Sequence, residues 1–186
     1  MTQQSSHKSD LQVQIREAYG RLVYTYTAHL KRVERTTKWN KWVKYAQIIL
    51  SAISTGGFIG AAVSNQNVAT WIGGIFATVL LALNLFFKDF NLVEEINQHR
   101  KAADELWLIR EQYISLLTDL STLDENLIMQ KRDELQIRTY EIYKQAPKTD
   151  PKSYSDARRA LQSEEEQFFL PNEIDRILPS HLRTDN

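Results

Sequence analysis

The strongest constraint in this sequence is a run of 43 residues without a charged side chain or a histidine, between Lys44 and Lys88. Two mostly apolar stretches, 45–63 and 68–87, are separated there by the polar tetrapeptide 64–67, Ser-Asn-Gln-Asn. At 1.5 Å per residue, each stretch forms a helix of roughly 30 Å, which matches the hydrocarbon thickness of a bilayer. Lipid offers the backbone no hydrogen-bond partners, so each stretch must be helical. The sequence therefore predicts an all-α membrane protein with a two-span transmembrane hairpin, 45–87, and a turn at 64–67.

A soluble alternative is a hairpin buried inside a globular helical bundle. Such a bundle needs enough further apolar surface to cover both helices on every side. A chain of 186 residues with this composition offers too little of it, so the membrane interpretation is preferred.

The residues that flank the run orient the hairpin. Six Lys/Arg side chains lie in the segment 31–44, Lys88 follows the second span, and the turn has none. The positive-inside rule then places both termini in the cytoplasm. Four aromatic residues are expected to anchor the hairpin at the two membrane interfaces: Trp39, Trp42, Tyr45 and Trp71. A basic stretch next to a span predicts contact with anionic lipid, and not with nucleic acid.

Two faces of the first span carry different side chains. Gln47, Ser51 and Ser54 fall within about 60° of one another, with Phe58 on the same line, and they are the candidate pore-facing residues. The alternative for these polar groups is a hydrogen bond to a neighbouring helix or to a carbonyl one turn earlier. Small residues with the spacing of close helix packing are Gly56 and Gly60 in the first span and Gly73, Gly74 and Ala77 in the second. We expect these two small-residue faces to meet inside the hairpin.

The parts outside the run are expected to be helical and cytoplasmic. Residues 1–44 form a basic helix with nine Lys/Arg against three Asp/Glu, and residues 88–186 carry fourteen against twenty. The opposite charges suggest that the two parts either pair or face different neighbours. Residues 88–146 form a long helical extension that continues the second membrane helix, with a break near Ser121, and packs antiparallel to the first helix. Its apolar stripe is expected to pack against Leu22, Tyr26 and Leu30, or against a second copy, through Leu106, Ile109, Tyr113 and Leu117. Residues 147–186 form short helices and a tail, with a capping box at Ser153 and Asp156 starting a helix to about Leu170.

A search for catalytic chemistry finds no candidate. The chain has no cysteine, and its four histidines are scattered. Glu95 and His99 are one helical turn apart, which predicts a surface ion pair more readily than a metal site. A di-iron bundle needs two Glu-x-x-His units, and neither is present. Every glycine except Gly20 belongs to the uncharged run, so no phosphate-binding loop exists. We expect neither a cofactor nor a metal, and no enzymatic activity.

The stretch from His99 to Asp119, HRKAADELWLIREQYISLLTD, follows the second span directly. Together with the basic, aromatic arm from His29 to Trp42 and the glycine-containing hairpin, it resembles the SLATT family. That family comprises two-transmembrane effectors associated with SMODS nucleotidyltransferases and SLOG proteins in bacterial conflict systems. The resemblance covers roughly residues 10–145.

The resemblance implies an anti-phage effector of the bacterial inner membrane that leads to cell suicide or dormancy. It implies a homo-oligomer that permeabilises or depolarises the membrane when triggered by a nucleotide signal, such as a cyclic nucleotide, or by a nucleotidyltransferase or sensor partner. A different function fits the same layout, namely a passive two-span anchor or scaffold that recruits a soluble partner through its cytoplasmic helices.

Overall fold

The computed structural model describes residues 2–64, 67–89, 91–167, 169–170, 173–179 and 183. The ordered elements in these ranges are helices, and no strand occurs among the described residues, which confirms the all-α class. The described residues form six helices in order: α1 (Thr2–Ser64), α2 (Asn67–Asp89), α3 (Leu92–Asp119), α4 (Glu125–Gln145), α5 (Pro151–Gln162) and α6 (Glu173–Ile177). The predicted turn includes Asn65 and Gln66, which lie outside the described residues, as does much of the tail after Leu170.

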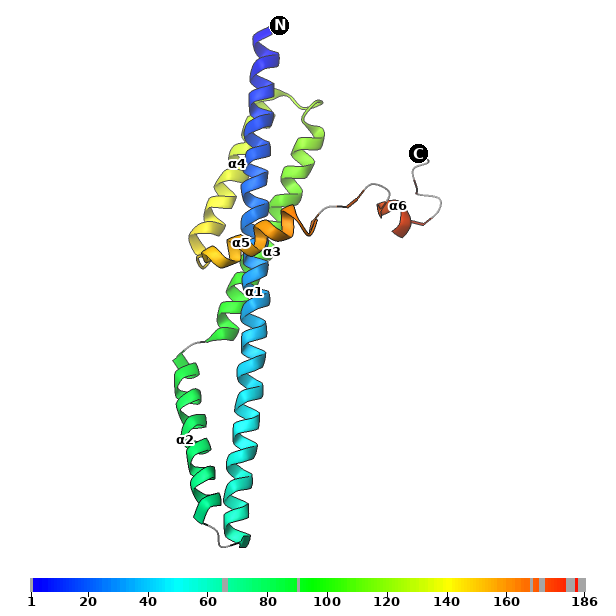
Figure 1. The fold of residues 1–186 in the computed structure, drawn as a ribbon. Coiled ribbons are helices and arrows are strands. Elements are labelled where there is room, and N and C mark those ends of the chain that lie inside the picture. Colours follow the sequence, from blue (N-terminus) through cyan, green and yellow to red (C-terminus); the bar gives the residue numbers. More distant parts are fainter. Residues whose placement is uncertain are drawn as a thin grey trace.

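Helix α1 is the axis of the molecule, and α2 and then α3 run antiparallel along it (Figure 1). Its 63 residues correspond to a length of roughly 95 Å. Cross-contacts fix the register. The Lys8 ammonium donates to the Ser121 carbonyl, His29 lies against His99, and Ser54 contacts Gly73. The first half of α1 thus packs against α3, and its last third packs against α2.

The hydrophobic core lies where α1, α3 and α4 meet. Leu106, Ile109 and Tyr113 are buried there, and Leu117 is partly buried against them. The other buried members of this cluster are Leu11, Ile15, Leu22, Leu116, Leu120, Ile128 and Leu135. Helix α5 crosses α1 near its middle, while α6 is drawn away from the bundle (Figure 1). The core therefore belongs to the charged half of the chain.

Helix boundaries differ from the expectation at two places. The second apolar helix does not run unbroken into the extension, because α2 ends at Asp89 and the Asn91 side chain caps α3 by accepting from the Glu94 N–H. Asp150, and not Ser153, caps α5, with Pro151 in its first turn, and α5 ends at Gln162. Asparagine, aspartate and proline each favour a helix start. The break near Ser121 is present, between α3 and α4.

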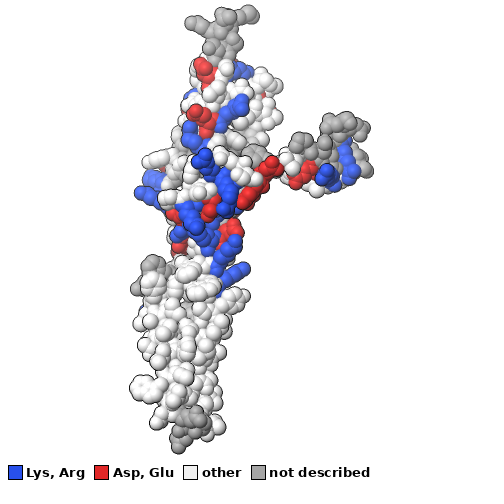
Figure 2. Space-filling view, in the orientation of Figure 1, with Lys and Arg blue, Asp and Glu red and all other residues white. Residues whose placement is uncertain are grey.

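The hairpin made by the end of α1 and by α2 exposes apolar side chains. Among the described residues, one segment, Asn67–Asp119, contains a window long and apolar enough to cross a membrane, and only 6% of that window is buried. A core helix of a soluble protein would be mostly buried. The hairpin surface carries no charge in Figure 2, whereas acidic and basic side chains gather over the opposite half of the molecule. This distribution associates the hairpin with a membrane.

Candidate functional site: the apolar hairpin and the charged junction beside it

The two helices of the hairpin touch at Gly57 and Gly73. A Cβ atom on Gly57 would lie 2.9 Å from the Gly73 Cα, and one on Gly73 would lie 3.2 Å from the Ser54 carbonyl oxygen. Real Cβ atoms essentially never approach other heavy atoms as closely as the first value. Glycine at these positions therefore lets the backbones of α1 and α2 meet, as small residues do between membrane helices.

The glycine of α1 that makes this contact is not one of the two expected, Gly56 and Gly60. A Cβ atom on Gly56, Gly60 or Gly74 would meet nothing within 4 Å, so these glycines do not make the contact inside the hairpin. Ala77 is half-buried. Successive residues of a helix are turned by about 100°, and α1 presents the face of Gly57 to α2 instead of the face of Gly56 and Gly60. A role of Gly56 and Gly60 between two copies of the chain stays a prediction.

The predicted polar line of α1 lies largely along the seam between the two helices. The Gln47 side-chain amide donates to the Asn84 Oδ1 at 3.0 Å, and the Ser54 hydroxyl donates to the Gly73 carbonyl at 3.2 Å. Ser54 is buried in the single chain, so its side chain is not available to face a pore there. Of the two alternatives for these groups, bonding to a neighbouring helix is the one that Gln47 and Ser54 adopt.

Ser51 and Phe58 remain exposed on the flanks of that seam. Ser51 belongs to a lateral groove of about 860 Å³ that runs between the two helices. The groove is lined by Lys44, Gln47, Ile48, Ser51, Ala52, Thr55, Gly56, Ile59, Leu80 and Asn84. None of the side-chain hydrogen bonds within the described residues involves Ser51 or Thr55. The groove thus presents two unpaired hydroxyls on an otherwise apolar surface.

Aromatic side chains mark the charged end of the hairpin. The rings of Trp39 and Trp42 stack with their centroids 5.4 Å apart. The Trp39 ring also lies near the ring of Phe87 on α2, with a centroid distance of 6.4 Å. Trp39, Trp42 and Tyr45 are exposed, and Trp71 is exposed near the far end of the hairpin. Exposed tryptophan and tyrosine at the two ends of an apolar segment are typical of membrane interfaces.

A charged junction connects α1 to α3 and α5 on the other side of these aromatics. The Arg32 guanidinium donates to the Glu95 carboxylate and to the Asp150 Oδ2, both at 2.6 Å. Arg35 pairs with the same Asp150 carboxylate and, at 3.4 Å, with Asp156. These contacts realise the pairing that the opposite charges of the two parts of the chain suggest.

Asp150 is the centre of this junction, because it caps α5 and binds both arginines. Burial acts to raise the pKa of this carboxyl, but the Ser153 N–H and the charges of Arg35 and Arg32 outweigh it and lower the pKa to about 2. Asp150 is therefore ionised at neutral pH. Loss of this one carboxylate would remove the N-cap of α5 and one ion-pair partner of each arginine, leaving Arg32 with Glu95 and Arg35 with Asp156.

Two buried histidines lie next to the junction. The Nδ1 atoms of His29 and His99 are 2.8 Å apart, and both residues are 2% exposed. Burial, with a contribution from His99, lowers the pKa of His29 to about 4, and burial also lowers the pKa of His99. The pair is thus neutral at pH 7, one ring donating to the other. The expected surface pair of Glu95 with His99 is wrong, because Glu95 turns to Arg32 and His99 turns into the core.

The sequence matches a known family described as SMODS and SLOG-associating 2TM effector domain family 4, and the match covers residues 11–173. The chain belongs to this SLATT family. The match begins at the first core residue of α1 and extends through α5, beyond the range expected from the sequence motif. The family is described as an effector domain, with no enzyme class in its description. No curated protein and no solved structure matches the chain.

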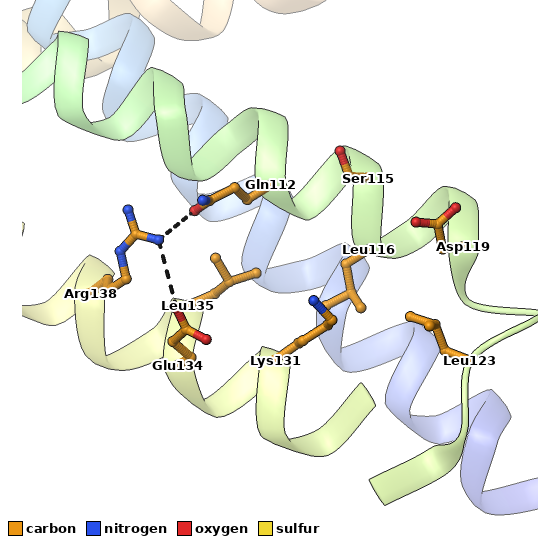
Figure 3. Close-up of a pocket in the computed structure, with 9 residues that line it drawn as sticks. All are labelled: Gln112, Ser115, Leu116, Asp119, Leu123, Lys131, Glu134, Leu135 and Arg138. Atoms are coloured by element: carbon orange, nitrogen blue, oxygen red, sulfur yellow. Dashed lines mark hydrogen bonds and ion pairs between the residues drawn. The ribbon is translucent and has the colours of Figure 1, made fainter. Parts of the chain in front are cut away.

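This SLATT chain also contains a polar pocket of about 280 Å³ between α3 and α4 (Figure 3). Arg138 donates to Gln112 at 2.8 Å and pairs with Glu134 at 3.9 Å, so its charge is already partnered. Leu116, Leu123 and Leu135 also line the pocket. No group of three or more potential metal ligands occurs within the described residues. The pocket carries no reactive constellation.

Sequence reasoning missed the histidine pair and Asp150 of this SLATT chain. His29 continues the helical spacing of Leu22 and Tyr26, and His99 continues that of Leu106. A histidine on each of two core stripes is therefore a usable signal for a buried pair. Asp150 directly precedes Pro151, and a capping aspartate followed by proline is a favoured arrangement for a helix start. This dipeptide is a usable sequence signal for the cap of α5.

Proposed function

We propose that this SLATT chain is a bacterial anti-phage effector that crosses the inner membrane twice and keeps both termini in the cytoplasm. Copies of the chain assemble through their hairpins and permeabilise or depolarise the membrane when a cytoplasmic trigger acts on the helical bundle. The family description, a two-transmembrane effector domain, supports the two spans and the effector role. The uncharged hairpin and its aromatic ends support the topology.

The observation that carries the proposal is the polar groove on the apolar hairpin. The hydroxyls of Ser51 and Thr55 face outward from a single chain, and Lys44 stands at the charged end of the same groove. An unpaired polar group in lipid costs free energy unless it meets a partner or water. Grooves of neighbouring copies that face one another would supply both, and water between them would form a conduction path.

The route from the cytoplasm to the hairpin is a single helix. Arg32 on α1 holds Glu95 and Asp150, and it lies twelve residues before Lys44, a distance of roughly 18 Å along the helix. A trigger that moves α3 or α5 changes these ion pairs and rotates or shifts α1 as a rigid rod. Such a helix shift at an interface is a known means of switching between closed and open assemblies. The proposed triggers are a cyclic-nucleotide signal or a nucleotidyltransferase or sensor partner, in keeping with the associations in the family description.

The test replaces the two groove hydroxyls. The double variant Ser51→Leu, Thr55→Leu should insert normally, since leucine is favourable in lipid, but an apolar path closes by dewetting. We expect wild-type cells to depolarise when the chain is expressed with its signalling partner, and cells with the double variant to keep their membrane potential. A potential-sensitive dye and the surviving fraction are measured together, with the amount of membrane-inserted protein as reference.

The matched control is Thr70→Leu, Thr78→Leu on α2. These two hydroxyl residues are also exposed but do not line the groove, and Thr78 already donates to the Gly74 carbonyl. The control should depolarise cells as the wild type does. Full depolarisation by the Ser51, Thr55 variant at normal expression would remove the groove from the mechanism.

A second candidate function is a passive two-span anchor. The observation that favours it is the exposed apolar surface of α3 and α4, on which Leu108 and Ile137 line one groove. Trp107 of α3, at 47% exposed, and Tyr140 of α4, at 61%, are further exposed aromatic residues on the same two helices. A soluble partner docked there would be recruited to the membrane. An anchor leaves the membrane potential unchanged under every condition of the test above, which separates the two functions.

A further inference from the structure

A cavity of about 640 Å³ lies in the charged helical bundle, and none of its lining residues belongs to the apolar hairpin. Helices α1, α4 and α5 form its walls, with Tyr113 of α3 also in its lining. The lining residues are Ala18, Gly20, Arg21, Tyr24, Thr25, Tyr113, Gln136, Thr139, Tyr140, Tyr143 and Tyr154. The volume falls within the range of pockets that hold small organic ligands.

The chemistry of the cavity is aromatic. Five of the chain's eight tyrosines line it, although it is one of several grooves between these helices. Tyr24 and Tyr154 stack with centroids 5.7 Å apart, and the Tyr143 hydroxyl donates to the Thr25 hydroxyl at 3.3 Å. Tyrosine faces stack on flat rings, and the Tyr140 and Tyr154 hydroxyls and the Gln136 amide can supply hydrogen bonds at the ring edge. The Tyr24 hydroxyl already accepts from Gln162, and the Thr139 hydroxyl donates to the Leu135 carbonyl.

Gly20 keeps the wall of the cavity open. It lies inside α1, where glycine costs about 1 kcal/mol relative to alanine, and its φ is not positive. A Cβ atom there would meet nothing within 4 Å, so no close packing requires glycine. The missing side chain of Gly20 therefore leaves free space in the cavity.

Arg21 gives the cavity its charge. Among the described residues that line it, none is acidic and Arg21 is the one basic residue. Its partner Glu17 lies one turn away at 3.1 Å, and both side chains are 67% exposed. An exposed pair of this kind contributes little, so the guanidinium is available to an anionic ligand group.

We propose that this cavity binds a ligand with a flat aromatic ring and an anionic group, of the size and chemistry of a nucleoside monophosphate unit. The ring lies among the tyrosines in the space beside Gly20, and Arg21 binds the anion. Binding of the ligand does not depend on the proposed function. Only the further role of the ligand as a trigger of the effector rests on that function. Tyr154 belongs to α5, whose first turn is held by Asp150, so a ligand that displaces the Tyr24–Tyr154 stack acts on the junction with Arg32.

The experiment uses the full chain in lipid nanodiscs and equilibrium dialysis with AMP, GMP, CMP and UMP, the corresponding nucleosides, and inorganic phosphate. We expect saturable binding of at least one nucleoside monophosphate, at least tenfold weaker binding of its nucleoside, and no competition by phosphate at equal concentration. Arg21→Gln should remove the preference for the phosphorylated ligand and leave nucleoside binding intact.

Gly20→Leu is the decisive variant, because leucine favours the helix while its side chain fills the cavity. We expect at least a tenfold loss of binding with unchanged or raised thermal stability, and Gly20→Ala should keep binding within threefold. Absence of binding by all four monophosphates, or equal binding by wild type and Gly20→Leu, would overturn the proposal. Binding with these properties by a chain that never depolarises cells leaves the site in place and removes only the effector function.

Discussion

At the scale of single residues, the hairpin depends on which glycine faces which helix. Gly56 and Gly60 have the spacing associated with close helix packing, yet Gly57, one position along, makes the contact with Gly73. The faces of Gly57 and Ser54 lie on the same side of α1, so the polar seam and the close contact coincide. The hydrogen bond from Ser54 to the Gly73 carbonyl and the close approach of the Gly57 and Gly73 backbones therefore stabilise the same part of the contact between α1 and α2.

This arrangement predicts different effects of alanine at two glycines. Gly57→Ala places a methyl group 2.9 Å from the Gly73 Cα, forces the helices apart and weakens the Ser54 hydrogen bond. Overpacking of this kind costs about 1–3 kcal/mol in the free energy of unfolding. Gly60→Ala, whose Cβ meets nothing within 4 Å, should leave it unchanged or slightly raised. Unfolding of both variants by SDS titration measures the difference. Equal losses would show that the seam runs along another face.

Part of this site could be predicted from the sequence and part could not. Segregation of charge identifies the hairpin, and the polar tetrapeptide divides it, because both signals are local. The face that α1 turns toward α2 depends on rotation about the helix axis. Both faces of the first span carry residues suited to an interface, Gly56 on one and Ser54 on the other. Spacing alone does not choose between them.

At the scale of elements, the contact between α1 and α3 includes the buried pair of His29 and His99. Burial and the neighbouring ring lower the pKa of His29 from 6.5 to about 4, so the unfolded chain binds a proton more readily than the folded one between these values. The stability contributed by neutral His29 is complete above pH 6.5 and is lost as the pH falls toward 4. The charged groups facing the pair are Arg32, Glu95 and Asp150.

We therefore predict that the α1–α3 contact weakens upon acidification. The melting temperature of the chain in detergent should fall between pH 6.5 and 4, and the fall should be smaller for the variant His29→Gln, His99→Gln, whose amides can bond to each other without titrating. Circular dichroism across the pH range gives both curves. Identical slopes for variant and wild type would mean that carboxylates alone account for the acid sensitivity.

The helices themselves were largely predictable, and their ends were less so. The apolar stripe containing Leu106, Ile109 and Tyr113 follows helical spacing closely, and these residues are buried in the core. The break before α3 escaped prediction because neither glycine nor proline marks it. Helix α2 ends at Asp89, and Asn91 caps α3 through a single side-chain hydrogen bond. A cap of this kind is a weak signal within a long helical pattern.

At the scale of the whole molecule, the chain is divided into an uncharged hairpin and a larger, charge-paired helical bundle, with α1 common to both. Lys31, Arg32 and Arg35 of α1 bind acidic residues that follow the hairpin in sequence, among them Glu166 at 2.5 Å from Lys31. The basic arm is thereby partly neutralised within the chain. Lys41 and Lys44, exposed and nearer to the hairpin, keep their charge for anionic lipid headgroups.

This division predicts the topology of the chain in the inner membrane. The flanking lysines and arginines favour the cytoplasm, so the turn at 64–67 should face the periplasm and both termini the cytoplasm. The chain has no cysteine, so single introduced cysteines report position without background. A membrane-impermeant maleimide should label Asn65→Cys in intact spheroplasts. Gln12→Cys and Ser163→Cys, at exposed positions on α1 and at the end of α5, should react only after lysis.

The controls separate topology from accessibility. Each variant is labelled again after solubilisation, which must give equal reaction at all three positions, and the membrane fraction is extracted with carbonate to establish that the hairpin is inserted. Labelling of Gln12→Cys and Ser163→Cys in intact spheroplasts would invert the topology. Protection of Asn65→Cys until lysis, with the other two also protected, would mean that the hairpin does not cross the bilayer. That result would remove the two-span arrangement on which assembly through the Ser51 groove depends.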